Sequence, residues 1–480
     1  MTPYFATAPL PVPRGRMLLV TYHFPPGIAV GGLRWQKMAR VASERGWELD
    51  VLALDPAALD RQDPSRLHDL PPGVRVFGVP VPRSLADVVE APLARAHALA
   101  RRLRSRREGP MAGPASTGTG ATAREEEGSV AVADIHFNPL VPRHWSRALN
   151  TWIWLHRDDA WARRAARVAE ALYRDGARYA AVITSGPPHQ VHAALSPVAR
   201  RFRAPHIVDM RDPWTLQQRL VEGVASPLYF WLSGRAERRA LAGSELLVCN
   251  TIPFLEAMRM AFPGRPAHRM TVMNGWDPEA IPPRGPWSRF GIAYAGSIYL
   301  DRNPRPLFEA ARRVIERHGL TPDDLGIEFM GSVHAYRGRT IEAIAAESGV
   351  GPFVRTLPTG GRREVLQFLS TASVLVSLPQ DSDLAIPSKV FEYMLFPAWL
   401  LVLAGPGSAT AQALADTSAA VIDPNDVESL ANRLELWYGE FRKGKLPVPL
   451  STDDRLSRRG QAELLFDTIE RDVLHLKERL

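Results

Sequence analysis

The chain has 480 residues, of which 45% are hydrophobic and 23% are charged, and it carries a formal net charge of +8 at pH 7. This is the composition of an ordinary globular protein, and it excludes a chain that is disordered throughout. Because single domains rarely exceed about 250–300 residues, we expect two α/β domains with connecting segments.

The cysteine content and the hydropathy pattern bear on location. Cys249 is the only cysteine, so an intrachain disulfide is excluded and a reducing compartment is favoured. The N-terminus lacks the charged segment and apolar run of a signal peptide, and no apolar stretch reaches the ~20 residues of a membrane-spanning helix. We therefore expect a cytoplasmic protein. The sequence also lacks a basic and aromatic nucleic-acid motif, so nucleic acid is not an expected partner.

Strands and helices alternate through the first part of the chain. Apolar strands are predicted at residues 17–22, 48–54, 180–184 and 206–210, and helices at residues 33–45, 159–173 and after residue 188. This rhythm implies a parallel sheet with helices on both faces. Residues 103–130 shift to Gly, Ala, Ser, Thr and charged residues, which predicts a flexible insertion without a core of its own.

The same rhythm begins again after a proline-rich stretch at residues 279–289. Further strands are predicted at residues 291–294, 326–330, 374–378 and 399–403, followed by an amphipathic helix at residues 461–480. We therefore expect an N-terminal domain at residues 1–282 and a C-terminal domain at residues 283–455. Residues 456–480 are expected to form a helix that packs back on the N-terminal domain.

The corner between Pro387 and Glu392 is the strongest candidate for a binding site. Proline suits the first position of a helix, and the free N–H groups of a first helical turn attract an anion such as a diphosphate. Ser388 and Lys389 lie beside that turn, and Glu392 falls on the same helix face, where its carboxylate can accept ribose hydroxyls. The alternative is an ordinary capped helix with a Lys–Glu surface pair.

The stretch from Pro387 to Met394, followed by the apolar residues 399–403, resembles the donor-binding signature of the family 4 retaining glycosyltransferases. Motifs at residues 22–26, 184–188, 209–214, 274–277 and 295–297 also occur in an order similar to that of the family. The resemblance implies the GT-B architecture, in which two Rossmann-like domains with parallel sheets face each other. It further implies transfer of a hexosyl residue, with retention, from a UDP- or GDP-sugar to a hydroxyl of a glycan or polyprenyl-linked acceptor.

One position departs from the family pattern. Family 4 often carries two glutamates eight positions apart, and the partner of Glu392 falls at Leu384. Either Asp381 or Asp383 could replace that carboxylate, or both could be solvated loop residues. The sequence therefore does not assign the groups that bind the hydroxyls of the donor sugar.

Two glycine-containing loops are candidates for donor contacts. Gly31 and Gly32 precede a predicted helix, where backbone can approach a ligand closely, and their spacing is not that of a nicotinamide-binding loop. The resemblance assigns them to the donor phosphate or to the acceptor, with Arg34 on the acceptor side; the alternative is a tight turn with Arg34 at the surface. Gly296 and Ser297 follow the first predicted strand of the second domain.

Two basic residues are candidates for neutralising the negative charge of the leaving group. Arg302 lies near the position of a family residue that neutralises the pyrophosphate, and Lys389 is the second cation. Such cations can stabilise a leaving nucleoside diphosphate without a metal, so we expect neither a metal nor a cofactor. The alternative is that Arg302 is a solvated loop residue, since Arg305 is an equally basic neighbour.

The remaining candidates follow two strands of the first domain. The resemblance places a histidine against the donor sugar, and His189 lies nearer the strand end than His192, so His189 is the catalytic candidate. Asp212 could orient the acceptor hydroxyl, with Asp209 and Arg211 on the acceptor side, because open α/β sheets bind ligands at the carboxyl ends of their strands. The alternatives are a turn-capping role or an Asp209–Arg211 pair.

Other functions and partners remain open. The arginine-rich residues 93–107 could contact an anionic membrane surface at its cytoplasmic face, or could form a solvated helix. A sugar-nucleotide 2-epimerase of the same architecture is a second candidate function. A non-catalytic nucleotide-sugar-binding scaffold is the third, because the carboxylate at Leu384 is missing.

Overall fold

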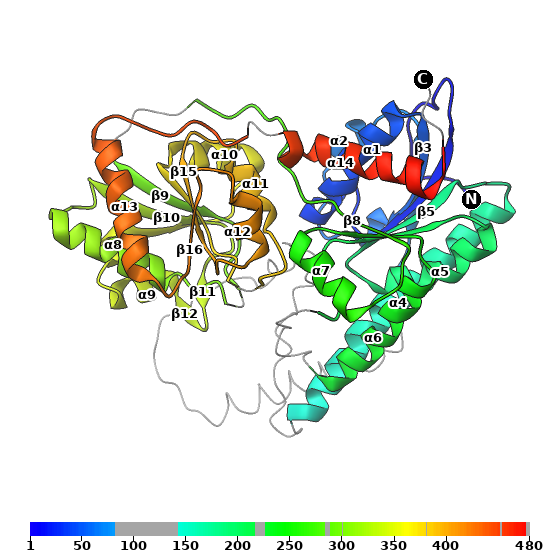
Figure 1. Ribbon diagram of the computed structural model, residues 1–480, viewed down its shortest axis with the longest axis horizontal. Helices are drawn as coiled ribbons and strands as arrows, with labels where there is room; N and C mark the ends of the chain where they lie inside the picture. The colour runs from blue at the N-terminus through cyan, green and yellow to red at the C-terminus, as the bar shows by residue number, and fades with distance from the viewer. Residues whose placement is uncertain are drawn as a thin grey trace. The chain divides into compact units, whose positions relative to one another are not determined.

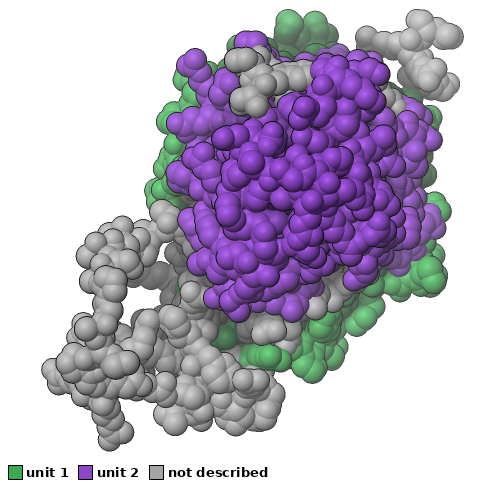
Figure 2. Space-filling view, turned by 90° about the vertical axis from the view of Figure 1, so that its left-hand side faces the viewer, with its two compact units in different colours: residues 1–249, 258–270, 465–480 green, residues 250–257, 271–464 purple. Residues whose placement is uncertain are grey.

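The structure is a computed structural model that describes residues 1–81, 143–216, 226–283, 289–299, 301–380, 382–451 and 454–476 (Figure 1). The chain divides into two compact units, coloured separately in Figure 2. Unit 1 comprises residues 1–249, 258–270 and 465–480, and unit 2 comprises residues 250–257 and 271–464. The predicted insertion at residues 103–130 and the arginine-rich residues 93–107 lie outside the described ranges.

Unit 1 is built on an eight-stranded sheet in the order β1-β4-β3-β2-β5-β6-β7-β8. The strands from β2 to β7 pair in parallel, and β1 is antiparallel to β4. The strands are β1 (Phe5–Ala6), β2 (Gly15–Thr21), β3 (Trp47–Leu54), β4 (Val74–Val79), β5 (Ala181–Gly186), β6 (His206–Met210), β7 (Leu246–Cys249) and β8 (His268–Thr271).

The helices between these strands complete the α/β pattern. The first predicted strand, observed as β2, and the helix after Gly32 lie within two residues of their predicted positions, whereas the helix predicted at residues 159–173 begins at Arg143. The helices are α1 (Leu33–Glu44), α2 (Ser65–His68), α4 (Arg143–Arg174), α5 (Gln190–Phe202), α6 (Pro227–Ala242) and α7 (Ile252–Ala261), with 3-10 turns at Val30–Gly32 and Pro56–Ala58.

The end of the chain contributes to unit 1. The predicted helix at residues 461–480 is observed as α14 (Arg458–Thr468), which continues into a π-helical turn at Ile469–Val473. Within that turn Glu470 accepts a hydrogen bond from Trp47 Nε1 at 2.8 Å and pairs with Arg45 at 3.3 Å. These contacts tie the last turn to the edge of α1 and the start of β3.

Unit 2 repeats the architecture with a six-stranded parallel sheet in the order β13-β10-β9-β14-β15-β16. Its strands are β9 (Phe290–Ala295), β10 (Leu325–Met330), β13 (Val354–Leu357), β14 (Val374–Ser377), β15 (Trp399–Leu403) and β16 (Ala420–Ile422). Its remaining elements are α8 (Arg305–His318), α9 (Ile341–Glu347), α10 (Arg362–Thr371), α11 (Ser388–Tyr393), α12 (Ala409–Leu414), α13 (Val427–Arg442), the hairpin β11 (Ala335–Tyr336) and β12 (Arg339–Thr340), and 3-10 turns at Gly351–Phe353 and Asp454–Leu456.

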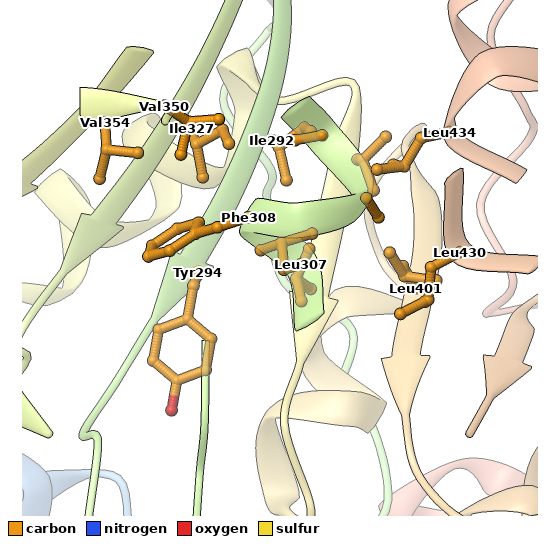
Figure 3. Packing of buried hydrophobic residues seen from close by; sticks show 14 of the residues in the cluster. Ile292, Tyr294, Leu307, Phe308, Ile327, Val350, Val354, Leu401, Leu430 and Leu434 are labelled. Atoms are coloured by element: carbon orange, nitrogen blue, oxygen red, sulfur yellow. The ribbon is translucent and has the colours of Figure 1, made fainter. Parts of the chain in front are cut away.

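Alternate side chains of β9 show why both faces of this sheet need helices. Ile292 and Tyr294 pack with Phe308 of α8 and Leu434 of α13 on one face (Figure 3). Ala293 and its neighbours on the other face pack against α10 and α11. A parallel sheet that is apolar on both faces must be covered on both, which explains the near-continuous apolar runs in the sequence.

Candidate functional site

In each unit the strand order reverses at one point. Reading the strands of unit 1 in chain order from β2 to β7, and those of unit 2 from β9 to β16, both sheets have the order 3-2-1-4-5-6. Open parallel sheets with this order bind ligands outside the carboxyl ends of the two strands that flank the reversal. The candidate sites are therefore the loops after β2 and β5 in unit 1, and after β9 and β14 in unit 2.

In unit 2, Lys389 lies at this point and is 9% exposed. Its Nζ donates to the Tyr294 hydroxyl at 2.9 Å and lies 4.1 Å from the centre of the Tyr294 ring. No carboxylate in the described ranges forms an ion pair with Lys389. Buried ammonium groups are normally paired with an anion. Among the described residues the Lys389 ammonium has no such counter-charge, so a bound anion would stabilise it.

Gly296 explains how the ammonium fits beside the end of β9. Its φ is 129°, a conformation that other residues rarely adopt, and a Cβ atom at this position would collide with Lys389 Nζ. The structure therefore brings together two residues, Gly296 and Lys389, that the sequence nominated separately. Ser388 is the first residue of α11 and is half-buried. The helix was predicted to begin at Pro387, which is instead the residue before it, so α11 begins one residue later than predicted.

Arg302 and Ser297 lie in the loop that follows β9. Arg302 is 4% exposed, and it donates to the Ser297 carbonyl at 3.2 Å and to the Tyr299 hydroxyl at 2.7 Å. Its neighbour Arg305 is one-third exposed and pairs with Glu347 at 3.7 Å. The two arginines are therefore not equivalent, and the alternative of a solvated Arg302 is wrong.

Glu392 pairs with a residue that the sequence did not nominate. Its Oε1 lies 2.5 Å from Arg362 Nη1, and Arg362 also contacts Glu279 through Nε at 3.1 Å. Both Glu392 and Arg362 are between one-third and one-half exposed. The Lys–Glu surface pair considered as an alternative is not formed, because the Lys389 side chain is buried against Tyr294.

The loop before α11 contains the position that departs from the family. The Leu384 carbonyl accepts from Thr251 Oγ1 at 2.6 Å, and its N–H donates to Ser382 Oγ at 3.2 Å. Asp383 is exposed, and Asp381 lies outside the described residues. Hydrogen bonds between two side-chain hydroxyls and the backbone of Leu384 therefore fix the course of the loop there.

In unit 1, Asp209 is fully buried at the end of β6 and accepts hydrogen bonds from three residues. The Arg34 guanidinium donates two hydrogen bonds to the carboxylate, from Nη2 at 2.9 Å and from Nε at 3.2 Å. Trp35 Nε1 and Ser185 Oγ each donate to the same carboxylate at 2.8 Å. The ion-pair partner of Asp209 is thus Arg34, so the alternative of an Asp209–Arg211 pair is wrong. Arg34 is buried, so its alternative placement at the surface is wrong.

Arg211 holds the glycine loop against the end of β5. Its guanidinium donates to the carbonyls of Gly31 at 2.6 Å, Gly186 at 2.9 Å and Pro187 at 3.0 Å. Burial lowers the pKa of Arg211, although the nearby carboxylates of Asp212 and Asp209 oppose that shift. A Cβ atom at residue 31 would collide with the guanidinium, which explains that glycine.

The other predicted residues of this unit lie around the same strand ends. Gly32 closes the 3-10 turn before α1, and Asp212 follows Arg211 and is partly exposed. His189 is the residue before α5, and its ring stacks on Trp214 with centroids 5.4 Å apart. Burial, with a smaller contribution from Arg211, lowers the pKa of His189 to about 3, so the ring is neutral at pH 7.

The chain was compared with known sequences and structures. The sequence matches no protein-family model and no curated protein sequence. A sucrose-phosphate synthase from Thermosynechococcus elongatus is similar in structure, with a TM-score of 0.57 and 14% identity over 96% of this chain and 100% of that chain. HepE from Anabaena, solved in complex with UDP, gives a TM-score of 0.54 and 13% identity over 95% of this chain and 99% of that chain.

A third similar structure, described as a UDP-N-acetylglucosamine 2-epimerase from Listeria monocytogenes, has a TM-score of 0.51 and 10% identity, covering 96% of this chain and 97% of that chain. These similarities extend over nearly the whole of each protein. They confirm the predicted fold class, which is α/β with two Rossmann-like units of the GT-B architecture. At identities of 10–14% they show the fold alone.

Neither a metal-binding cluster nor a candidate membrane-spanning helix occurs among the described residues. Among these residues, no group of three or more His, Cys, Asp or Glu side chains is arranged to hold a metal ion. None of the described helices combines the length and apolar character that crossing a bilayer requires. Membrane contact through residues 93–107 falls outside the described ranges and stays a prediction.

Proposed function

We propose that this chain is a glycosyltransferase that moves a hexosyl residue from a UDP- or GDP-sugar to a hydroxyl of a glycan or polyprenyl-linked acceptor. The observation that carries the proposal is the buried ammonium of Lys389, which has no carboxylate partner among the described residues and lies beside Gly296. A desolvated cation at a sheet reversal is stabilised by an anionic ligand, and a diphosphate fits that requirement.

The roles of the residues follow from the charge that develops in the reaction. When the bond between the sugar and the diphosphate breaks, negative charge accumulates on the leaving nucleoside diphosphate. We propose that Lys389 and Arg302 stabilise that charge, together with the backbone of Gly296 and Ser297 and with Ser388 at the start of α11. We propose that Glu392 accepts hydrogen bonds from the ribose hydroxyls. His189 is proposed to contact the hexosyl group, and Asp212 to orient the acceptor hydroxyl.

The residues of unit 1 that are held by internal contacts form the frame of the acceptor side. Arg34 and Asp209 fix α1 to the end of β6, and Arg211 fixes Gly31 to the end of β5. Retention at the anomeric carbon and membership of family 4 rest on the sequence resemblance. The fold similarity to HepE, which was solved with UDP, is consistent with a uridine nucleotide.

The proposal is tested with a panel of nucleotide sugars, each offered with a set of hydroxyl acceptors, while release of nucleoside diphosphate and the glycosylated product are measured. We expect one donor class to release nucleoside diphosphate in proportion to the glycosylated acceptor. Tight nucleotide binding without turnover on any acceptor would instead identify a binding scaffold.

The epimerase remains a second candidate, because one protein with the same fold is described as a UDP-N-acetylglucosamine 2-epimerase. An epimerase would convert its donor in the absence of any acceptor. Analysis of the sugar product with acceptor omitted therefore separates the two functions.

Substitution of Glu392 tests the ribose contact. We expect Glu392→Gln to raise the KM for the nucleotide sugar about tenfold, the equivalent of roughly 1.4 kcal/mol, because one charge-assisted hydrogen bond is weakened. The matched control is Arg362→Gln, which removes the present partner of Glu392 and should leave the carboxylate free for the ribose. A Glu392→Gln variant with the wild-type KM would contradict the assignment.

The reaction is expected to proceed without a divalent metal. The cationic side chains of Lys389 and Arg302 can supply the stabilisation that a metal provides in other enzymes. Initial rates should therefore be the same with and without a chelator. Activity that disappears with chelator and returns with manganese would show that this expectation is wrong.

A further inference from the structure

Helix α6 presents two different faces. On its buried face, Tyr229 stacks on Trp154 of α4 with ring centroids 5.8 Å apart (Figure 1). Ser226, the residue before the helix, lies 2.8 Å from Thr151 of α4 between their hydroxyl oxygens. The exposed residues recur every three or four positions and therefore form a single stripe along the helix: Pro227, Phe230, Trp231, Arg235, Arg238, Arg239 and Ala242. We call these residues the α6 stripe.

Two adjacent aromatic side chains form the apolar part of the stripe. Phe230 is 43% exposed and Trp231 is 58% exposed, and no other phenylalanine or tryptophan of the described ranges is exposed to this degree. Arg235 lies one turn further along, with its guanidinium carbon 5.3 Å from the centre of the Trp231 ring. Single exposed apolar side chains are common, so the informative feature is that both rings are adjacent and lie on one helix face.

The rest of the stripe is basic. Arg235, Arg238 and Arg239 follow the aromatic pair within about two turns, and none of them pairs with a carboxylate in the part of the chain that the structure describes. Glu237 is the only acidic residue of α6, and it is fully buried, where it accepts a hydrogen bond from Thr215. The stripe therefore carries three positive charges and no negative charge.

The size and charge of the stripe favour a lipid surface over a protein partner. A stable protein interface uses about 20–30 residues on each side, and its centre is poor in charged residues. The α6 stripe is much smaller, and three of its residues are arginines. Helices that lie in the surface of a bilayer combine Trp and Phe, which insert between head groups and acyl chains, with Arg and Lys, which attract anionic lipids.

We propose that the α6 stripe is a docking surface for an anionic lipid bilayer. Phe230 and Trp231 insert at the level of the head groups. Arg235, Arg238 and Arg239 bind lipid phosphates, which a guanidinium contacts through two parallel hydrogen bonds. Because α6 is already held against α4, docking does not require the helix to fold. This surface is separate from the arginine-rich segment considered in the sequence, and the proposal does not depend on which donor or acceptor the protein uses.

The test is sedimentation of the full-length protein with vesicles of phosphatidylcholine, with and without about one-third phosphatidylglycerol. We expect the wild type to bind the anionic vesicles more tightly, and to bind them less tightly as salt is added. The triple variant Arg235→Gln, Arg238→Gln and Arg239→Gln should bind about 100-fold more weakly, because each basic residue near an anionic surface strengthens binding about fivefold. Equal binding of the wild type to neutral and anionic vesicles would overturn the proposal.

The aromatic side chains are tested by a second variant. Phe230→Ala combined with Trp231→Ala removes both rings and places a good helix former at both positions. We expect it to bind anionic vesicles about tenfold more weakly or less, because the apolar area that enters the bilayer is lost. Wild-type affinity in this variant or in the triple variant would contradict the proposal. A concentration-dependent dimer that the double variant dissociates would also overturn it, since the stripe would then join two copies of the chain.

Controls in unit 2 separate the stripe from the overall charge and hydrophobicity. Replacing Arg312, Arg313 and Arg317 of α8 by Gln removes the same charge from side chains that are 39%, 39% and 49% exposed. Leu436→Ala removes an apolar side chain that is 56% exposed. Both controls should bind vesicles as the wild type does, and an equal loss of binding in the α8 variant would contradict a specific surface on α6.

Two further readouts complete the experiment. All variants should unfold close to the wild-type temperature, because the substituted residues are at the surface, so a loss of binding reports the contact itself. Nucleoside-diphosphate release by the wild type is measured on the same preparation. Vesicle binding as expected without any glycosyl transfer would support the docking surface and contradict the proposed function alone.

Discussion

Lys389→Met is expected to lower kcat/KM for the nucleotide sugar by about 10²–10³-fold, the loss found when one preorganised group that stabilises transition-state charge is removed. The ammonium is buried, and among described side chains its only hydrogen-bond partner is the Tyr294 hydroxyl. Methionine has a similar length and fills the same space without the charge. Steady-state kinetics with the donor identified by the panel measures the effect.

The same variant separates a functional lysine from a structural one. A buried cation without a carboxylate costs stability, so its removal should leave the unfolding temperature unchanged or raise it. Tyr294→Phe is the matched control, because it removes the hydroxyl and keeps the cation and the ring, and its kcat/KM should fall by less than about tenfold. A Lys389→Met variant that is destabilised, or that turns over at the wild-type rate, would refute an anion-binding role.

Asp209→Asn is expected to destabilise unit 1 by about 3–5 kcal/mol, since it leaves the buried guanidinium of Arg34 without its counter-charge. The amide group also cannot accept all of the bonds that the carboxylate accepts from Arg34, Trp35 and Ser185. Thermal unfolding should show a loss on the order of 10 °C.

The control for this variant is an exposed ion pair of the same unit. Arg163 pairs with Asp159 one turn away on α4, and both side chains are about half exposed. Such pairs contribute roughly 0–1 kcal/mol, so Arg163→Gln should unfold close to the wild-type temperature. Equal unfolding temperatures for Asp209→Asn and Arg163→Gln would mean that the buried network does not contribute the expected stability.

The sequence predicted the strands that flank both reversals, because they are short, apolar and separated by helical segments. It also nominated Gly296 and Lys389 on separate grounds, and the structure places them in contact. These successes depend on patterns that are local in the chain. The helix α4 was predicted too short, because its N-terminal half contains three tryptophans, and aromatic residues weaken a helical pattern.

Partners distant in sequence could not be predicted in this way. Asp209 and Arg34 are 175 residues apart, and the choice between Arg34 and Arg211 depends on where α1 packs. Tyr294 appears in the sequence as one more apolar residue of a buried strand, yet its hydroxyl receives the hydrogen bond from Lys389. Likewise, Arg362 gives no local signal that it will pair with Glu392.

The division of the chain limits how the protein can be taken apart. The chain passes from unit 1 to unit 2 after Cys249, returns at Met258, leaves again after Met270 and comes back at Leu465. A fragment that ends at Met270 would lose Glu470, and with it the acceptor for the Trp47 indole. A fragment that starts at residue 271 would lack Thr251, which fixes the loop at Leu384. Neither Rossmann-like unit is one uninterrupted stretch of polypeptide, so fragments for separate expression must be joined from discontinuous segments.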